Sequence, residues 1–208
     1  MQKIQFTSGC PNQCSYCYEP KEMKYYDPII PEDNQVQILD MNFLSNPNAL
    51  EILRQLPKKK YEFVCGVDYR ILTQEICNLM KEKGFIKVRW AWDYGFSQQK
   101  IHQKVWRMFK KAGYRNEELS VFVLVNWKIP FIECCKKLDL LKIWNVKVND
   151  CCYDGGYPKN EIDYNNNKRF NGKRFWRYQD IKKFGIGKNS LRRKHNQMVL
   201  FKIDPELK

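Results

Sequence analysis

Short apolar runs alternate with longer segments of helical periodicity between Ile4 and Asp150. The short runs are rich in Val, Ile, Phe or Trp, the residue types that favour buried strands. The pattern predicts six strands, over Lys3–Thr7, Val36–Asp40, Tyr61–Val67, Phe85–Ala91, Leu119–Val125 and Val146–Asn149.

Four helices are predicted between these strands from the spacing of apolar residues and from residues that begin or end helices. Thr73 and Ser97 stand at N-cap positions, and Gly84 and Gly113 follow the last turns of the same two helices. The predicted helices are Asn48–Leu56, Thr73–Lys83, Ser97–Ala112 and Pro130–Ile143. The positions predicted to form the apolar face of the third helix are Ile101, Val105, Met108 and Phe109.

Strands separated by helices of this length indicate βα units, and therefore an α/β fold with a parallel sheet and right-handed crossovers. The connection from Cys17 to Gln35 is long and contains three prolines. It is either a functional loop or a loop with a short helix.

The alternation ends after Tyr153, so we expect a core over residues 1–153 and a C-terminal extension over residues 154–208. Within the extension, Phe175–Phe184 is a possible helix, and Gln197–Ile203 is a possible last strand or covering segment. The extension is predicted to pack on the sheet or close it, and to add no further βα unit.

The composition and the first residues of the chain indicate the cellular compartment. No stretch of the 208 residues approaches the roughly 18 apolar residues that a membrane helix needs. The first residues lack the features of a secretory signal, which predicts a cytoplasmic protein with no membrane partner. Nine cysteines, an odd number that includes two adjacent pairs, argue against a disulfide framework and favour a reducing compartment and metal ligation.

Positive charge is concentrated at the C-terminus. The net charge is +14, and the segment Pro158–Lys208 carries 14 Lys and Arg against 5 Asp and Glu, a net of +9. This asymmetry suggests an anionic partner for the last quarter of the chain. The alternative is the amino-acid bias of an AT-rich genome, because 27 of the basic residues are Lys and only 10 are Arg.

The most specific motif lies in the loop after the first predicted strand. Cys10, Cys14 and Cys17 have the spacing C-x3-C-x2-C. Three thiolates from one tight loop suit three corners of an iron–sulfur cubane, and no fourth ligand stands nearby. One iron is then open to a small molecule, which indicates catalysis. A zinc site with a distant fourth ligand is the alternative, but no second ligand pair is present.

This motif resembles that of the radical S-adenosylmethionine (radical SAM) superfamily, and the resemblance covers roughly residues 3–150. It implies a [4Fe–4S] cluster whose open iron binds S-adenosylmethionine, and an oxygen-sensitive enzyme that generates a 5′-deoxyadenosyl radical. It implies a partial (βα)6 TIM-like barrel as the fold, and a reductant such as flavodoxin or ferredoxin as a partner. Tyr16 matches the aromatic position beside the adenine.

The resemblance also directs attention to the end of the second strand. The superfamily often has Gly-Gly-Glu there, which meets the amino group of the methionine moiety. This chain has Ile38-Leu39-Asp40-Met41-Asn42-Phe43 instead. Asp40 and Asn42 are candidates to accept hydrogen bonds from that ammonium, with a loop cap as the alternative for Asp40.

Polar residues follow three later strands, at the edge where active sites of parallel sheets collect. Asp68 and Asp93 are suited to ribose hydroxyls or substrate, and Arg70 is expected to pair with Asp93 or with the carboxylate of the methionine moiety. Asn126 follows the fifth strand as a further polar contact. No catalytic residue is assigned.

The remaining cysteines and both histidines receive simpler interpretations. Cys65 and Cys77 are expected to be core residues. The doublets Cys134-Cys135 and Cys151-Cys152 lack the spacing preferred for an auxiliary cluster. His102 is predicted to lie on the surface of its helix, and His195 on a solvated basic face.

The substrate is not determined by the sequence. Basic residues interleaved with aromatics, as in Lys173-Arg174-Phe175-Trp176-Arg177-Tyr178, suggest a nucleic acid or nucleotide. The alternatives are a peptide, a small metabolite, or activation of a glycyl-radical enzyme. A different class is a non-catalytic iron–sulfur protein for electron transfer or sensing.

Overall fold

The fold was obtained as a computed structural model, which describes residues 1–17, 22–125, 129 and 131–152. The expected extension over residues 154–208, with its helix at Phe175–Phe184 and its strand at Gln197–Ile203, lies outside the described residues. The strands are β1 Gln2–Ile4, β2 Thr7–Ser8, β3 Lys24–Tyr25, β4 Gln35–Ile38, β5 Lys60–Phe63, β6 Val88–Trp92, β7 Leu119–Val125 and β8 Lys147–Cys152. The helices are α1 Ala49–Gln55, α2 Gln74–Lys83, α3 Gln99–Lys111 and α4 Phe131–Ile143, with 3-10 turns η1 Phe43–Ser45, η2 Phe96–Gln98 and η3 Asn116–Glu118.

Six of the strands form two parallel sheets, with the orders β1-β4-β5 and β6-β7-β8. Two isolated parallel bridges, Tyr61 with Phe85 and Val67 with Trp90, link the end of the first sheet to the beginning of the second. The six strands therefore follow one another in space in their order along the chain. A short antiparallel pair, β2 with β3, lies beside the first sheet.

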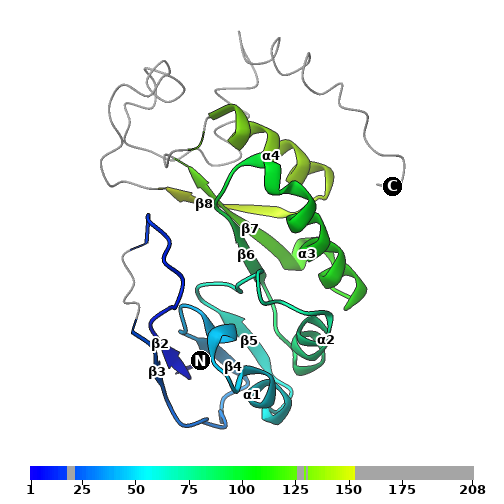
Figure 1. Cartoon of the computed structure of the whole chain (residues 1–208). Coiled ribbons are helices and arrows are strands. Elements are labelled where there is room, and N and C mark those ends of the chain that lie inside the picture. Colours follow the sequence, from blue (N-terminus) through cyan, green and yellow to red (C-terminus); the bar gives the residue numbers. More distant parts are fainter. Residues whose placement is uncertain (18–21, 126–128, 130, 153–208) are drawn as a thin grey trace.

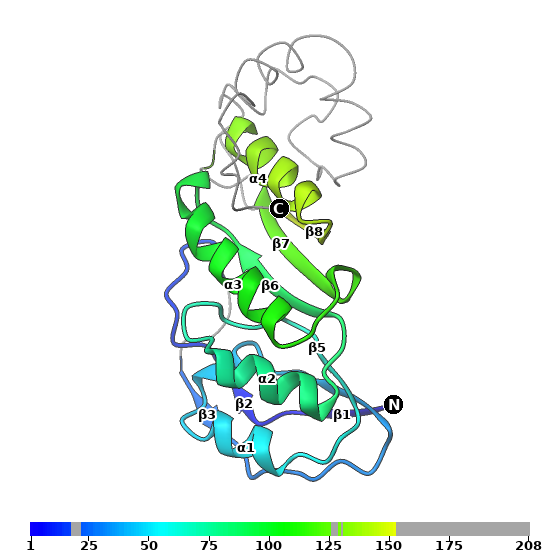
Figure 2. The same ribbon diagram turned by 90° about the vertical axis from the view of Figure 1, so that its right-hand side faces the viewer.

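The helices lie together on one side of the strands. In Figure 1 they stand to the right of the strands, and in Figure 2 they run in front of them, from α1 below to α4 above. The N-terminal loop lies on the other side, at the left of Figure 1. Connections through helices on one side leave the opposite side of the strands to the cysteine loop.

Aromatic side chains fill the space between sheet and helices. Along β6, Val88, Trp90 and Trp92 are buried and alternate with half-buried residues, as expected for a strand packed mainly on one face. Trp90 packs on Phe109 of α3 with ring centroids 5.6 Å apart, and Phe85 stacks on Phe63 at 4.8 Å. This core holds the ends of the strands in fixed positions.

The helix α2 shows both of its predicted end signals. The Thr73 side chain accepts a hydrogen bond from the Ile76 N–H at 3.2 Å, and Gly84 takes the left-handed conformation with φ of 92°. A Cβ at Gly84 would lie 2.1 Å from the carbonyl oxygen of Lys59, so the position needs glycine for two reasons. The predicted cap of the next helix is wrong, because α3 begins after Gln98 and its N-cap residue accepts no side-chain hydrogen bond.

Two further details of α3 differ from the expectation. His102 is fully buried, whereas Ile101 is 47% exposed. The His102 ring lies between the rings of Tyr69 and Trp92, with centroids 4.6 and 4.5 Å away. The prediction of a surface histidine is therefore wrong, because aromatic partners distant in sequence turn this face of the helix inward.

The strand positions agree with the pattern, and β7 has the predicted bounds. The described part of the long connection, residues 22–34, contains β3 and no helix. The pair β2–β3 was not predicted, because two-residue strands leave no periodic signal. None of the helices among the described residues is long and apolar enough to cross a membrane.

Candidate functional site

The cysteine motif occupies the loop that follows β2, at the carboxyl ends of the parallel strands. Gly9 enters this loop with φ of 79°, a conformation that glycine adopts easily. The three thiols are free of disulfides. Cys10 and Cys14 are half-buried and Cys17 is exposed. A turn closes with a 3.0 Å hydrogen bond from the Cys17 N–H to the Cys14 carbonyl, which holds these two residues close together.

Asp68, which follows β5 and the bridge residue Val67, joins the cysteine loop to the strand ends. Its carboxylate accepts hydrogen bonds from the Asn12 amide at 2.8 Å and from the Asn42 amide at 2.9 Å. It also pairs with the Arg70 guanidinium, at 2.7 and 3.0 Å. Burial alone would raise the pKa of Asp68, but the hydrogen bonds from Arg70 and Asn12 outweigh it and lower that pKa. The carboxylate is therefore charged and fully engaged.

Asn42 connects this cluster to the first cysteine. Its Nδ2 lies 3.6 Å from the Cys10 Sγ, within reach of a hydrogen bond to sulfur. Its Oδ1 is buried and has no hydrogen-bond partner among the described residues. Buried acceptors of this kind are uncommon and call for an explanation.

A second polar group surrounds Tyr16. Its hydroxyl donates to the Asp93 carboxylate at 2.6 Å, and its ring lies 6.5 Å from that of Tyr94. Burial raises the pKa of Asp93, although the hydrogen bond from Tyr16 and the charge of Lys137 act in the other direction. Burial, together with the Asp93 charge and hydrogen bond, raises the pKa of Tyr16. The Cys14 thiol lies close enough to Tyr16, Tyr94 and Arg70 to raise the pKa of all three.

Lys137 of α4 supports this group from the far side of the sheet. It is 0% exposed, and its ammonium donates to the Trp92 carbonyl, at the end of β6, at 3.1 Å. Burial lowers the pKa of Lys137, and the charge of Asp93 opposes that shift. The ammonium thus lies next to the strand end from which Asp93 projects.

Asp40 is held by the segment that follows β1. Its Oδ1 accepts the Phe6 N–H at 3.0 Å, and the side chain is fully buried. Burial raises the pKa of Asp40 to about 6, against the effect of that hydrogen bond. The carboxyl therefore ties the end of β4 to the segment after β1, the role of a loop cap.

The structure thus sorts the predicted site residues into groups. Cys10, Asn42, Asp68 and Arg70 come together, Tyr16 and Asp93 form a second group beside Cys14, and Asp40 stands apart. Arg70 pairs with Asp68 and not with Asp93, because the two residues leave the same turn. Asn126 lies outside the described residues.

Three residues of these groups carry no signal of their own in the sequence. Asn12 lies inside the cysteine motif, and its position there is the one clue that was available. Tyr94 follows a predicted strand end beside Asp93. Lys137 lies in a helix that also carries Lys136 and Lys142, and lysines are rarely buried, so nothing singled it out.

The other described cysteines serve packing. Cys77 and Cys134 are buried, and the Cys65 thiol lies 3.3 Å from the Met41 sulfur. No auxiliary cluster is indicated by these side chains. His195 lies outside the described residues.

The cysteine side chains are compatible with the iron–sulfur cluster that their motif implies. Within the described part of the chain, no three His, Cys, Asp or Glu side chains are gathered closely enough to hold a single metal ion. A cubane places each thiolate on a different iron, so its ligands lie further apart than those of one ion. Three cysteines on one loop that form no disulfide, with an amide N–H directed at one sulfur, fit such a cluster chemically.

Comparison with known proteins adds no family assignment. No protein-family model matches this chain, and no curated protein matches it.

Proposed function

We propose that this chain is a radical SAM enzyme, in which Cys10, Cys14 and Cys17 hold a [4Fe–4S] cluster. The observation that carries the proposal is the C-x3-C-x2-C loop, whose three cysteines form no disulfide and which lies at the carboxyl ends of a parallel strand series. Active sites of α/β folds collect at that edge. When bound and reduced, the cluster supplies the electron that splits S-adenosylmethionine into methionine and a 5′-deoxyadenosyl radical.

The partial (βα)6 barrel belongs to the same proposal. Six parallel strands in chain order, with helices on one side, are the arrangement that such a barrel requires. The strand face away from the helices would then form the inner wall, and the cysteine loop its rim.

Asn42 acts on the cluster through Cys10. An N–H that points at a ligating sulfur stabilises the thiolate charge and raises the reduction potential of an iron–sulfur centre. Asp68 holds that amide in place, because it accepts from the same Nδ2 at 2.9 Å. It also fixes Asn12 within the loop, so one carboxylate orders two parts of the site.

The unpartnered Oδ1 of Asn42 supports a role in binding S-adenosylmethionine. An ammonium would supply the hydrogen-bond donor that this buried oxygen lacks. Tyr94 is 43% exposed and lies against Tyr16, which offers aromatic surface for an adenine. Asp93 is suited to ribose hydroxyls, and Asn126 stays a candidate contact. The position of Asp40 favours a supporting role for that residue.

A matched pair of cysteine variants tests the ligand assignment. Cys14→Ala removes a proposed ligand, and Cys65→Ala removes a half-buried thiol outside the motif. We expect anaerobic reconstitution to load iron and sulfide on wild type and Cys65→Ala, and to fail on Cys14→Ala. In the loaded proteins, S-adenosylmethionine should change the electron paramagnetic resonance spectrum of the reduced cluster. Equal iron loading of both variants would show that the ligand set is wrong.

The identity of the substrate is the least constrained part of the proposal. We favour a nucleic acid or nucleotide over a peptide or small metabolite, because of the net charge of +14. A flavodoxin or ferredoxin would supply the electron, in the reducing cytoplasm that the free thiols favour. A cluster whose spectrum does not respond to S-adenosylmethionine would instead favour electron transfer or sensing.

A further inference from the structure

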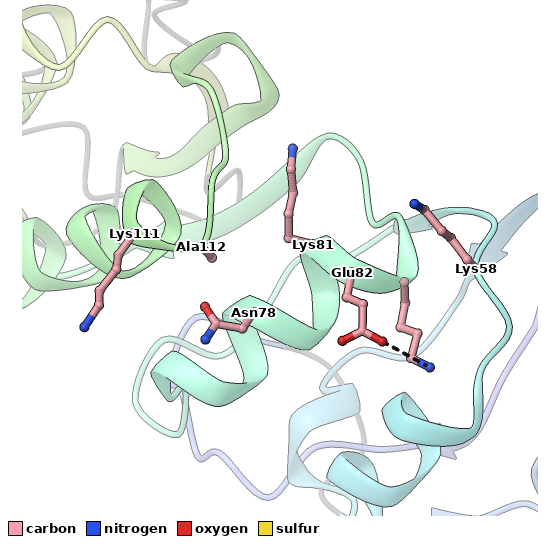
Figure 3. A pocket seen from close by; sticks show the side chains of 7 residues that line it. Lys58, Asn78, Lys81, Glu82, Lys111 and Ala112 are labelled. Carbon is pink, nitrogen blue, oxygen red and sulfur yellow. Dashed lines mark ion pairs between the residues drawn. The ribbon is translucent and has the colours of Figure 1, made fainter.

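A basic hollow lies among the ends of two helices, away from the cysteine loop. It measures about 410 Å³ and is bordered by α2, by the last turn of α3 and by the loop before β5. Figure 3 shows this region from close by. Its polar lining is Lys58, Asn78, Lys81, Glu82, Lys83 and Lys111.

The hollow is separate from the proposed cluster site. The C-terminal ends of α2 and α3 lead toward the starts of β6 and β7, so the hollow lies near the amino ends of the strands. The cysteine loop lies at their carboxyl ends. A ligand held here therefore neither needs nor touches the cluster.

Positive charge exceeds negative charge around this hollow. Lys81 pairs with Glu118 at 2.9 Å, and Lys83 lies 3.7 Å from Glu82. The side chains of Lys58 and Lys111 are exposed and form no hydrogen bond or ion pair with any residue that the structure describes. Lysines in a last helical turn offset the helix dipole, which accounts for part of this charge. Lys58 lies on a loop, so the dipole does not account for it.

The shape of the lysine set indicates which anion fits. In Figure 3, Lys58 and Lys111 stand on opposite sides of α2, and the labelled ammonium groups do not converge on one point. A compact anion would need converging donors. A chain of phosphates can meet separated lysines one after another, and Asn78 adds a side chain suited to phosphate or sugar oxygens.

The hollow has no large apolar side chain in its lining, where Ala112 is the one apolar residue, and this argues against a membrane surface. Among the described residues, the exposed large hydrophobic side chains include Ile71, Tyr94, Ile101 and Ile143, and none of them lines the hollow. Binding to a lipid interface usually combines basic residues with inserted apolar ones. We propose that the hollow binds the phosphodiester backbone of a nucleic acid strand through Lys58, Lys111 and the lysines between them.

The test compares two double variants with equal changes in net charge. K58E/K111E alters the hollow, and K100E/K104E alters two exposed lysines of α3 that do not line it. Binding of the full-length reconstituted protein to a fluorescein-labelled single-stranded oligonucleotide is measured by anisotropy over a series of salt concentrations. Both variants keep the proposed cluster ligands, so production of 5′-deoxyadenosine without nucleic acid should equal that of wild type.

We expect K58E/K111E to weaken binding about tenfold or more, and to reduce the slope of log K against log salt by about 1.4, the value for two lost contacts to single-stranded phosphates. We expect K100E/K104E to change the affinity less than about threefold. Equal losses in the two variants would mean that overall charge alone attracts the strand. A wild type that does not bind the oligonucleotide would overturn the proposal, as would a larger K58E/K111E effect on anionic vesicles or polyglutamate. None of these outcomes bears on the cluster.

Discussion

At the scale of single residues, Lys137 is the most unusual group in the described structure. An ammonium that is 0% exposed is stable only when hydrogen bonds and opposite charge compensate its lost hydration. The Trp92 carbonyl supplies the hydrogen bond, and Asp93 supplies the nearby negative charge. Asp93 in turn accepts from Tyr16, so a helix outside the sheet helps to position the cysteine loop.

Lys137→Met therefore tests a positioning residue, with the half-buried Lys136→Met as its matched control. Lys137→Met leaves the Trp92 carbonyl without its hydrogen bond and removes the positive charge near Asp93, so a loss of about 1–3 kcal/mol of unfolding free energy is expected. Lys136→Met should change the unfolding free energy by less than about 0.5 kcal/mol. Both are measured by chemical denaturation.

A double-mutant cycle separates charge coupling from packing. Asp93→Asn removes the charge that Lys137 faces, so Lys137→Met with Asp93→Asn should lose less than the sum of the two single changes. Purely additive losses would contradict the assignment. The reconstituted variants should also differ in the spectrum of the reduced cluster, which a packing defect remote from the loop would leave unaltered.

His102 makes the stability depend on pH. Burial, aided by the charge of Lys137, lowers its pKa from 6.5 to about 3. As the pH falls below 6.5, the unfolded chain takes up this proton first, so stability is lost down to about pH 3. This loss of unfolding free energy reaches about 1.4 kcal/mol per pH unit. His102→Phe keeps an aromatic ring between Tyr69 and Trp92 but has no titrating group there, so this variant should lose less stability at acid pH.

Asp40 acts with the opposite sign over part of that range. Its pKa is raised from 3.8 to about 6, so the folded protein takes up the proton first, and stability is gained as the pH falls from about 6 toward 3.8. Asp40→Asn should therefore make the loss of stability with falling pH steeper, whereas His102→Phe should make it shallower. Denaturation curves at several pH values measure both variants. Parallel pH profiles of the two variants would contradict both assignments.

At the scale of elements, the glycines that follow α2 and α3 offer a matched comparison. Gly84 and Gly113 have φ of 92° and 89°, but a Cβ at Gly84 meets a carbonyl oxygen at 2.1 Å, whereas one at Gly113 meets nothing within 4 Å. Gly113→Ala should cost about 1–2 kcal/mol, the strain of a left-handed residue. Gly84→Ala should cost clearly more, because the Lys59 backbone must also move. Equal losses of unfolding free energy for the two variants in urea denaturation would show that the Lys59 backbone moves readily away from a Cβ at residue 84.

Local patterns in the sequence were sufficient for most elements. Apolar alternation located β7 to the residue, and Thr73 with Gly84 bounded α2, because those signals arise within a few residues of chain. The burial of His102 could not be predicted this way, since its stacking partners come from two other segments. The pair β2–β3 depends on residues that lie far apart in the chain and not on periodicity.

In the candidate site, too, local motifs could be predicted from the sequence and individual side-chain contacts could not. The cysteine spacing was visible directly, and strand ends pointed to Asp68 and Asp93. Sequence alone did not pair Arg70 with Asp68, because backbone geometry at one turn decides that contact. Nor did it indicate Lys137, because nothing local distinguishes this lysine from Lys136 and Lys142 in the same helix.

At the scale of the whole molecule, two regions of positive charge complement the proposed chemistry. The described helices carry the basic hollow, and the segment Pro158–Lys208 contributes a net charge of +9 from sequence. Polyanions would be attracted to both, and the attraction weakens with salt. Because the strands are parallel, the hollow at their amino ends and the cysteine loop at their carboxyl ends lie at opposite ends of the sheets. A bound polymer could thus be held at one end while another part reaches the cluster site.

The most direct test of the central claim is the formation of 5′-deoxyadenosine. Full-length protein is reconstituted anaerobically with iron and sulfide, reduced with dithionite and mixed with S-adenosylmethionine, and the products are separated by liquid chromatography. The proposal predicts 5′-deoxyadenosine and methionine from wild type and from Cys65→Ala, and neither product from Cys14→Ala. A fully loaded wild-type cluster that yields no 5′-deoxyadenosine would contradict it.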